Sequence, residues 1–235
     1  MRKMVCDGLS THILLDKGIF YDIVIKDKKT YYDFVMSLLV QINNHENGKI
    51  VLSNDDEILN LSTNSIIIPD LFTWEINSKK NISLLHKYII KEYLASNTEL
   101  NFNALNTSAV KFLEQIRLSS QIDFDYSDEI GLLDILKTFD VKFEIPNVSL
   151  FENLTSFLKN MTYLSNIDIF WIIGIHDYFS QKELAELINY MALEKINIIS
   201  VEAHEYDNVL PNEIRLILDE DLCDYEIIGV DKTSK

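Results

Sequence analysis

Residues 167–201, IDIFWIIGIHDYFSQKELAELINYMALEKINIISV, decide the fold. Two apolar runs, residues 167–175 and 196–201, are too short to cross a bilayer and are predicted to be strands. Between them, Ser180 and Glu183 have the spacing of a capping box, which satisfies the free amides at a helix start. The helix then carries one apolar stripe, formed by Leu184, Leu187, Ile188 and Met191. The order strand, helix, strand predicts a parallel βαβ unit whose first strand, apolar on both faces, is central.

Composition is that of an ordinary globular protein. A chain of 235 residues can hold one large domain or a domain with a sizeable insert. Apolar residues make up 47% and charged residues 25%, which argues against disorder. No stretch qualifies as a membrane span, and the first residues lack the apolar core of an export signal. Cys6 and Cys223 lie at opposite ends of the chain, so we expect a reduced, cytoplasmic protein.

The formal charge of −16 argues against a protein that is basic over its whole surface. It does not exclude nucleic-acid binding, because cations gathered on one concave face act locally against an acidic exterior. Two lysine groups are available: Lys26, Lys28 and Lys29, and then Lys79 and Lys80 with His86, Lys87 and Lys91. Short lysine groups are more often solvated faces than phosphate sites.

The flanking segments extend the α/β pattern. Residues 13–25 are predicted to form a hairpin or two short strands, Thr30 to cap a helix over 31–42, and residues 50–52 and 66–68 to form strands. After residue 77 the sequence favours two helices over 82–118, interrupted at 97–106, then a helix over 127–139 and an exposed strand over 141–145. The spacing of apolar residues further predicts a helix over 150–163 and strands over 214–218 and 225–228. The prediction is an α/β head, residues 1–76 and 146–235, with a helical arm, residues 77–145, inserted in it.

Asp219 and Glu220 follow an apolar run, as do the acids that hold magnesium in nucleotide hydrolases. That chemistry also needs a glycine-rich phosphate cradle ending in Gly-Lys-Ser/Thr. The one Gly-Lys pair, Gly48-Lys49, lacks the upstream glycine and is followed by Ile50. We therefore interpret Asp219 and Glu220 as turn acids, with a divergent metal-dependent nucleotide hydrolase or nuclease as the alternative.

The densest acidic cluster contains Asp123, Asp125, Asp128, Glu129 and Asp134. Its oxygen side chains partly follow a calcium loop, but Asp128 stands where such a loop needs glycine. A helix start capped by Ser127 is the competing interpretation. Five histidines, never paired with each other or with cysteine at ligand spacing, argue against a zinc site. His176-Asp177 follows the first strand of the βαβ unit, where α/β ligand sites tend to lie, although a polar turn is the commoner explanation.

Several segments resemble, in the same order along the chain, segments of the ring-forming adaptation proteins of type II-A CRISPR systems, which are members of the Csn family. They are residues 70–78 (DLFTWEINS), 123–126 (DFDY), 133–144 (LDILKTFDVKFE), the stretch 164–201 and residues 216–221 (LILDED). Thr73 stands in place of a family glycine, and residues 203–212 form a short insertion.

The resemblance implies a head with a mainly parallel sheet like a degenerate, RecA-like nucleotide-hydrolase core. It also implies a homotetrameric ring with a central hole lined by cations, which binds double-stranded DNA ends without reading sequence. The role would be spacer acquisition, beside other CRISPR adaptation proteins and the effector nuclease. Catalysis is not implied, whereas structural calcium is, and the arm acids Asp123, Asp125, Asp128, Glu129 and Asp134 are its candidate ligands. The expected phosphate contacts are Lys26, Lys28, Lys29, Lys79 and Lys80. A third hypothesis is a calcium-responsive scaffold without a nucleic-acid role.

Overall fold

The computed structural model describes residues 1–15, 18–44, 48–55, 57–96, 99–145, 149–206 and 208–230. Its internal contacts separate two compact units. The first, called here the α/β unit, consists of Met1–Trp74 and Pro146–Lys235. The second, the helical unit, is Glu75–Ile145. Each unit is described by itself.

A six-stranded sheet forms the centre of the α/β unit, in the order β10-β9-β3-β8-β7-β6. Its strands are β3 (Phe20–Ile25), β6 (Ser65–Ile68), β7 (Ile169–Ile173), β8 (Asn197–Glu202), β9 (Glu213–Leu218) and β10 (Asp224–Ile228). Neighbouring strands from β9 to β6 are parallel, and only β10 is antiparallel, to β9. The predicted α/β class with a mainly parallel sheet is confirmed.

The predicted βαβ unit is present as β7, the helix α7 (Gln181–Glu194) and β8. Both halves of the capping box form: the Ser180 side chain accepts from the Glu183 amide, and the Glu183 carboxylate accepts from the Ser180 amide. The four residues of the apolar stripe are all buried. β7 is paired on both sides, with β8 and β6, and its first four residues are buried, but it lies next to the edge strand β6 rather than at the predicted centre of the sheet.

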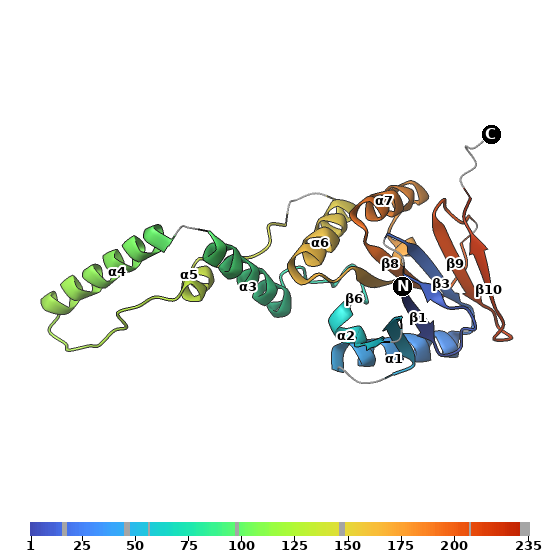
Figure 1. Cartoon of the computed structure of the whole chain (residues 1–235), viewed down its shortest axis with the longest axis horizontal. Coiled ribbons are helices and arrows are strands. Elements are labelled where there is room, and N and C mark those ends of the chain that lie inside the picture. Colours follow the sequence, from blue (N-terminus) through green and yellow to red (C-terminus); the bar gives the residue numbers. More distant parts are fainter. Residues whose placement is uncertain are drawn as a thin grey trace. The chain divides into compact units, whose positions relative to one another are not determined.

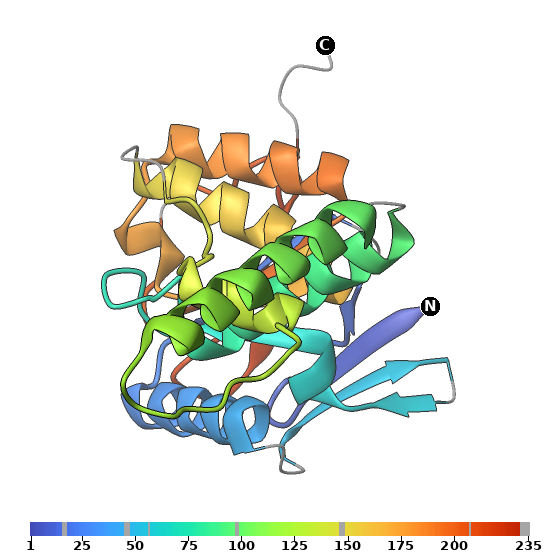
Figure 2. The ribbon, with the colours of Figure 1, turned by 90° about the vertical axis from the view of Figure 1, so that its left-hand side faces the viewer.

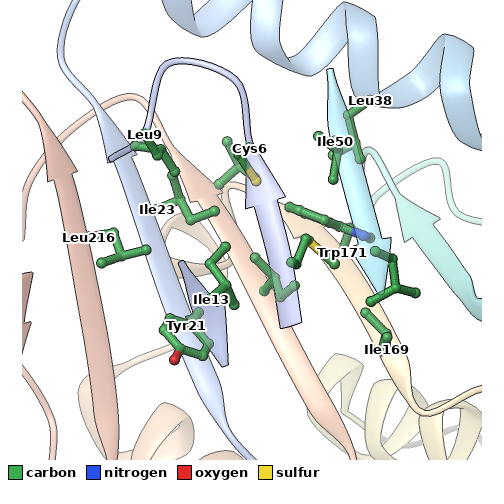
Figure 3. Close-up of a cluster of buried hydrophobic side chains, with 14 of the residues drawn as sticks. Cys6, Leu9, Ile13, Tyr21, Ile23, Leu38, Ile50, Ile169, Trp171 and Leu216 are labelled. Atoms are coloured by element: carbon green, nitrogen blue, oxygen red, sulfur yellow. The ribbon is translucent and has the colours of Figure 1, made fainter. Parts of the chain in front are cut away.

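Different layers cover the two faces of the large sheet. On one side lie the helix α1 (Lys28–Asn44) and a small antiparallel sheet ordered β2-β1-β4-β5, and α6 and α7 lie on the other side (Figures 1 and 2). The short elements are β1 (Arg2–Cys6), β2 (Ile13–Leu14), β4 (Ile50–Asn54), β5 (Glu57–Leu59), α2 (Leu61–Asn64) and the 3-10 turn η1 (Ile175–Asp177), and α6 is Leu150–Ser165. An apolar core fills the α1 side, with Trp171, Ile23, Cys6 and Leu38 among its buried members (Figure 3).

The helical unit contains α3 (Lys79–Ala95), α4 (Glu99–Ser119) and α5 (Leu132–Thr138). Ser78 caps α3 by accepting from the Asn81 amide. The buried His86 ring on α3 places Nε2 2.7 Å from the Val141 carbonyl oxygen. The Asn77 side chain accepts from the Phe143 amide and donates to its carbonyl. These contacts fix the segment after α5 against the start of α3.

The first segment confirms one expectation and corrects another. Residues 13–25 form two short strands, the second of the two predicted alternatives, and not a hairpin, because β2 pairs with β1 in the small sheet while β3 joins the large one. The next helix begins at Lys28 rather than Tyr31. Asp27, not Thr30, supplies the capping oxygen, since its Oδ1 accepts from the Thr30 amide and hydroxyl.

The helical unit also differs from its prediction. α4 already begins at Glu99, so the interruption is shorter than residues 97–106, of which 97 and 98 lie outside the described residues. α5 begins at Leu132 rather than at Ser127, whose hydroxyl bonds the Glu129 backbone in a local turn. Residues 141–145 are not a strand, because the Phe143 backbone is satisfied by an amide side chain instead of a neighbouring strand.

Candidate nucleic-acid interface and buried ionic cluster

The first lysine group lies where β3 passes into α1. Lys28 and Lys29 are exposed in the first turn of the helix. Lys26 instead forms an ion pair with Glu205, with 2.6 Å between Nζ and Oε2, and this contact raises the pKa of Lys26. Two of the three lysines are therefore available to a phosphate, and the third would have to leave a carboxylate.

The start of α1 is also where an α/β nucleotide hydrolase would hold a phosphate, because it follows the carboxyl end of a parallel strand. Here the Asp27 carboxylate takes that place, and hydrogen bonds from Thr30 lower its pKa. A negatively charged cap repels a phosphate and satisfies the amide that would bind it. This geometry agrees with the missing glycine-rich cradle.

The second lysine group follows one helix. α3 carries four lysines and a single acid, Glu92, over 17 residues. Lys80, Lys87 and Lys91 recur at intervals of seven and four residues, so they share one face of the helix. All three are exposed, as is Lys79. Within the described ranges, none of the four lies within 4 Å of a carboxylate oxygen, so their charge is not neutralised by a paired acid.

A hollow of about 390 Å³ lies along the same helix, inside the helical unit. Three lysines line it, Lys79 and Lys87 of α3 and Lys137 of α5. The other lining residues are the apolar Ile82, Ile90 and Leu133, with Ser83 and His86. Cations are thus concentrated on α3 in a chain whose overall charge is strongly negative.

The five predicted calcium ligands are all exposed. Asp123, Asp125, Asp128 and Glu129 lie in the irregular segment between α4 and α5, and Asp134 is in the first turn of α5. Asp128 also lines a polar hollow of about 460 Å³ with Asn103, Asn106, Thr107, Val110 and Lys111. In the described part of the chain no three of these acids bring their oxygens within 4.8 Å of one another. A calcium ion here would need ligands beyond those that one chain gathers, and the calcium assignment stays a prediction.

Asp219 and Glu220 stand in the turn between β9 and β10. The Asp219 Oδ1 atom accepts from the amides of Asp221, at 3.0 Å, and Cys223, at 2.9 Å. An aspartate used in this way holds a turn closed. The interpretation of these residues as turn acids explains their geometry, and nothing about it favours magnesium binding.

Sequence reasoning missed a buried ionic cluster on the face of the large sheet opposite the apolar core, beside the segment between β8 and β9. Its members are Asp22 of β3, His176 of η1, Glu202 of β8, and Glu213 and Arg215 of β9. The Arg215 guanidinium lies 2.8 Å from Asp22 Oδ2 and 2.7 Å from Glu213 Oε1. His176 Nε2 lies 3.4 Å from Asp22 Oδ2. The sequence signals were an aspartate inside the apolar strand FYDIVI and the polar pair His176-Asp177 at a strand end.

Burial dominates the electrostatics of this cluster. It raises the pKa of Glu202 to about 7, against the opposing effect of a hydrogen bond from Ser200. Burial also raises the pKa of Glu213. For His176 burial lowers the pKa, but the surrounding carboxylates, Asp22 first, raise it on balance. The raised pKa values of all three groups reflect an excess of negative charge held away from water.

Comparison with known proteins supplies the family. A family model described as CRISPR-associated protein (Cas_Csn2) matches residues 41–222, well over half of the chain. The chain belongs to the Csn2 family. The resemblance seen in the sequence is therefore confirmed, and the CRISPR association follows from it.

Individual Csn2 relatives are distant but similar in length. CRISPR-associated protein Csn2 of Streptococcus agalactiae is 22% identical over 170 residues, which cover 72% of this chain and 73% of the relative. Csn2 of Enterococcus faecalis is 20% identical over 214 residues, covering 90% and 93%. Among solved structures, the ADP conformation of an ABC-transporter ATP-binding cassette aligns at a TM-score of 0.43 and 11% identity, covering 92% of this chain and 86% of that one. So low a likeness carries no functional inference. Over the described ranges, no helix has the length and apolar character needed to cross a membrane.

Proposed function

We propose that this Csn2-family chain binds the ends of double-stranded DNA, without reading sequence, through the central hole of a homotetrameric ring. It acts in the cytoplasm in the acquisition of new CRISPR spacers, with the other adaptation proteins and the effector nuclease as partners. The observation that carries the proposal is the family match over residues 41–222. The exposed lysines of α3 supply the chemistry for phosphate binding.

Charge supports an enclosed binding surface. A chain with 37 acidic and 21 basic residues repels DNA over most of its exterior. Four copies of a cationic helix facing one hole would make a strong local field without a basic monomer. Lys28 and Lys29 of α1 in the α/β unit, and Lys79 and Lys80 of α3 in the helical unit, are exposed and are the proposed phosphate contacts, whereas Lys26 must first part from Glu205. Phosphate contacts of this kind carry no sequence information.

The proposed role is non-catalytic. Asp27 caps α1 where a phosphate cradle would be, and Asp219 is engaged in a turn. Calcium is proposed as a structural ion held through Asp123, Asp125, Asp128, Glu129 and Asp134. Because these acids do not converge in one chain, we expect the ion to depend on assembly.

Electrophoretic mobility shifts with linear and covalently closed circular duplex of the same sequence test the DNA-end proposal. We expect retention of the linear form alone, since a closed circle offers no end to thread. Equal affinity for the two forms contradicts threading. Measuring the oligomer mass with calcium and with chelator tests the ring separately, and a chain that stays monomeric in both contradicts it.

The α3 lysines give the first specific prediction. The double variant Lys80→Gln/Lys87→Gln should weaken DNA binding and reduce the slope of log affinity against log salt by about 0.9 for each phosphate that the variant no longer neutralises. Lys182→Gln is the matched control, because Lys182 is a highly exposed lysine of α7. Salt titrations of DNA binding provide the measurement. If the double variant and the control keep the wild-type slope, α3 does not contact phosphates.

A further inference from the structure

The buried ionic cluster of the α/β unit is not used in the proposed function. Asp22, His176 and Glu213 each offer one ligand atom, and these three atoms lie within 4.8 Å of one another. Asp22 and Glu213 are completely buried, and the His176 side chain is 5% exposed. Three separate elements, β3, η1 and β9, bring them together at one point.

Within the described residues, two polar atoms of this group are buried without a hydrogen-bond partner: Asp22 Oδ1 and His176 Nε2. An unpaired polar atom away from water destabilises the fold, so such atoms are rare unless a further group satisfies them. Both belong to residue types that bind metals, and the third member, Glu213, adds a carboxylate. The two unpaired atoms of the cluster therefore indicate that a cation or a proton binds there.

The charge balance points the same way. Three carboxylates, those of Asp22, Glu202 and Glu213, are at most 1% exposed. Arg215 is the guanidinium of the cluster, and it bonds Asp22 and Glu213. One positive charge leaves the set negative unless protons or a metal ion neutralise the remainder.

The surroundings of the three ligands resemble the outer shell of a metal site. Arg215 holds the two carboxylates, and the Leu210 amide donates to Glu213 Oε2 at 2.7 Å. The Tyr206 ring stacks on the His176 ring with 4.5 Å between centroids, and its hydroxyl donates to Asp177. Such partners orient ligands and are a usual part of metal centres. Glu213 Oε2, which accepts only the Leu210 amide, retains a second lone pair for a metal, and Asp22 Oδ1 accepts no hydrogen bond at all.

We propose that Asp22, His176 and Glu213 form a binding site for a divalent transition metal ion of the zinc type. Mixed imidazole and carboxylate ligands suit zinc better than the hard cations calcium and magnesium. Zinc–ligand bonds of about 2.0–2.2 Å place two tetrahedral ligands about 3.4 Å apart. The separation of His176 Nε2 and Asp22 Oδ2 is 3.4 Å. With three protein ligands the fourth position is left for water or Glu202. The site is distinct from the acids of the helical unit assigned to calcium.

Zinc binding to the full chain tests this directly. The protein is stripped with chelator, dialysed against zinc chloride and then against metal-free buffer, and its zinc content is measured by elemental analysis. We expect about one zinc per chain, retained in excess calcium. Cobalt in its place should give the visible absorption of a four-coordinate ion with nitrogen and oxygen ligands.

Variants locate the ion. His176→Gln should weaken zinc binding by more than about tenfold. His204→Ala, which removes an exposed histidine from the neighbouring loop, should leave it unchanged. Because zinc binds the folded chain, it should raise the unfolding temperature of the wild type and of His204→Ala but not of His176→Gln.

Two results overturn the proposal. One is a wild-type chain that retains no zinc, which would mean that protons, and not a metal ion, neutralise the cluster. The other is zinc bound equally by wild type and His176→Gln, or lost in His204→Ala, which places the ion on the surface. The wild-type stoichiometry and the cobalt spectrum decide the question even if His176→Gln does not fold. Neither measurement depends on DNA binding, so the proposed function can fail independently.

Discussion

At the scale of the residue, the α/β unit depends on a few positions whose environment admits one chemical type. Asp22 is a charged side chain in a strand whose other five residues are apolar, and all six are buried. The Arg215 guanidinium compensates the buried charge of Asp22 through an ion pair. It also donates to the carbonyl of Asn208, at 3.2 Å, and to that of Tyr206. One arginine thus ties β3, β9 and the segment between β8 and β9 together.

Gly18 gives a prediction about backbone space. Its φ is +88°, and a Cβ there would lie 2.6 Å from the Ala192 Cα at the end of α7. Gly18→Ala should therefore lower the free energy of unfolding by about 2–5 kcal/mol, combining the strain of a positive φ with a clash against backbone. Gly8→Ala is the control, because Gly8 has φ +93° but open space, and should cost about 1–2 kcal/mol. Urea unfolding measures both, and equal losses would contradict the clash.

Asp224 gives a prediction about pH. Its carboxylate accepts from the Ser10 amide and hydroxyl and from the Thr11 amide, at 2.6–2.9 Å. Burial alone would raise the pKa of Asp224, but these bonds lower it below its ordinary value on balance. A lowered native pKa stabilises the fold above the unfolded value and ceases to do so as pH falls through the native value.

Asp224→Asn should accordingly cost about 1 kcal/mol at neutral pH. The difference from wild type should shrink below about pH 4. Asp221→Asn, which changes an exposed aspartate of the turn that precedes β10, is the control and should change nothing. Denaturant unfolding at several pH values is the measurement. A constant difference across that range would mean that the ionised form of Asp224 does not stabilise the fold.

At the scale of the element, the helices that cover the sheet are fixed at their ends by short-range chemistry. α6 and α7 each begin with a complete capping box, from Ser149 and Ser180, and each ends at a residue in the left-handed conformation. These signals are readable along the chain because the partners are three residues apart. α5 has no side-chain cap hydrogen bond at its start and is only seven residues long. Weak end signals explain why its limits were predicted wrongly.

Ser180 tests the value of such a cap. Ser180→Ala should destabilise the fold by about 1 kcal/mol, because the Glu183 amide loses its acceptor, whereas Ser180→Gly should cost only a few tenths. Thermal or urea unfolding of the two variants provides the comparison. An alanine variant no less stable than the glycine variant would show that packing, not the cap, fixes the start of α7.

At the scale of the whole molecule, charge is the dominant property. A net charge of −16 causes self-repulsion in the compact chain, and several of the ion pairs between described residues are exposed and contribute little. Added salt screens this self-repulsion and so stabilises the fold, whereas it weakens DNA binding through lysines. Salt should therefore strengthen the fold while weakening the complex.

Raising sodium chloride from about 20 mM to about 300 mM should increase the unfolding temperature by a few degrees at neutral pH, since the Debye length falls below about 10 Å. At a pH nearer the pI of about 4.6 the effect should be smaller, because the net charge is smaller. Thermal unfolding monitored by circular dichroism makes the comparison. A salt effect that is unchanged near the pI, or a decrease at neutral pH, would show that self-repulsion is not what salt relieves.

The sequence by itself determined the parallel βαβ unit, the α/β class and the family. Hydrophobic periodicity, capping boxes and ordered motifs are local patterns, and each is complete within a few residues of the chain. The same local logic predicted α6 and the closing strands, and it failed where a partner lies far away. Residues 141–145 alternate like a strand, yet the Asn77 side chain takes the Phe143 backbone.

Only the tertiary structure decided the ionic cluster. Asp22, His176 and Glu213 lie on three elements separated by more than a hundred residues in one case, and no spacing in the chain links them. The parallel neighbours β3 and β9 bring Asp22 and Glu213 together, η1 adds His176, and the Arg215 guanidinium compensates the buried carboxylates. Local periodicity determines which side chains are buried. The order of the strands determines which buried charges come into contact, and no short stretch of sequence contains that order.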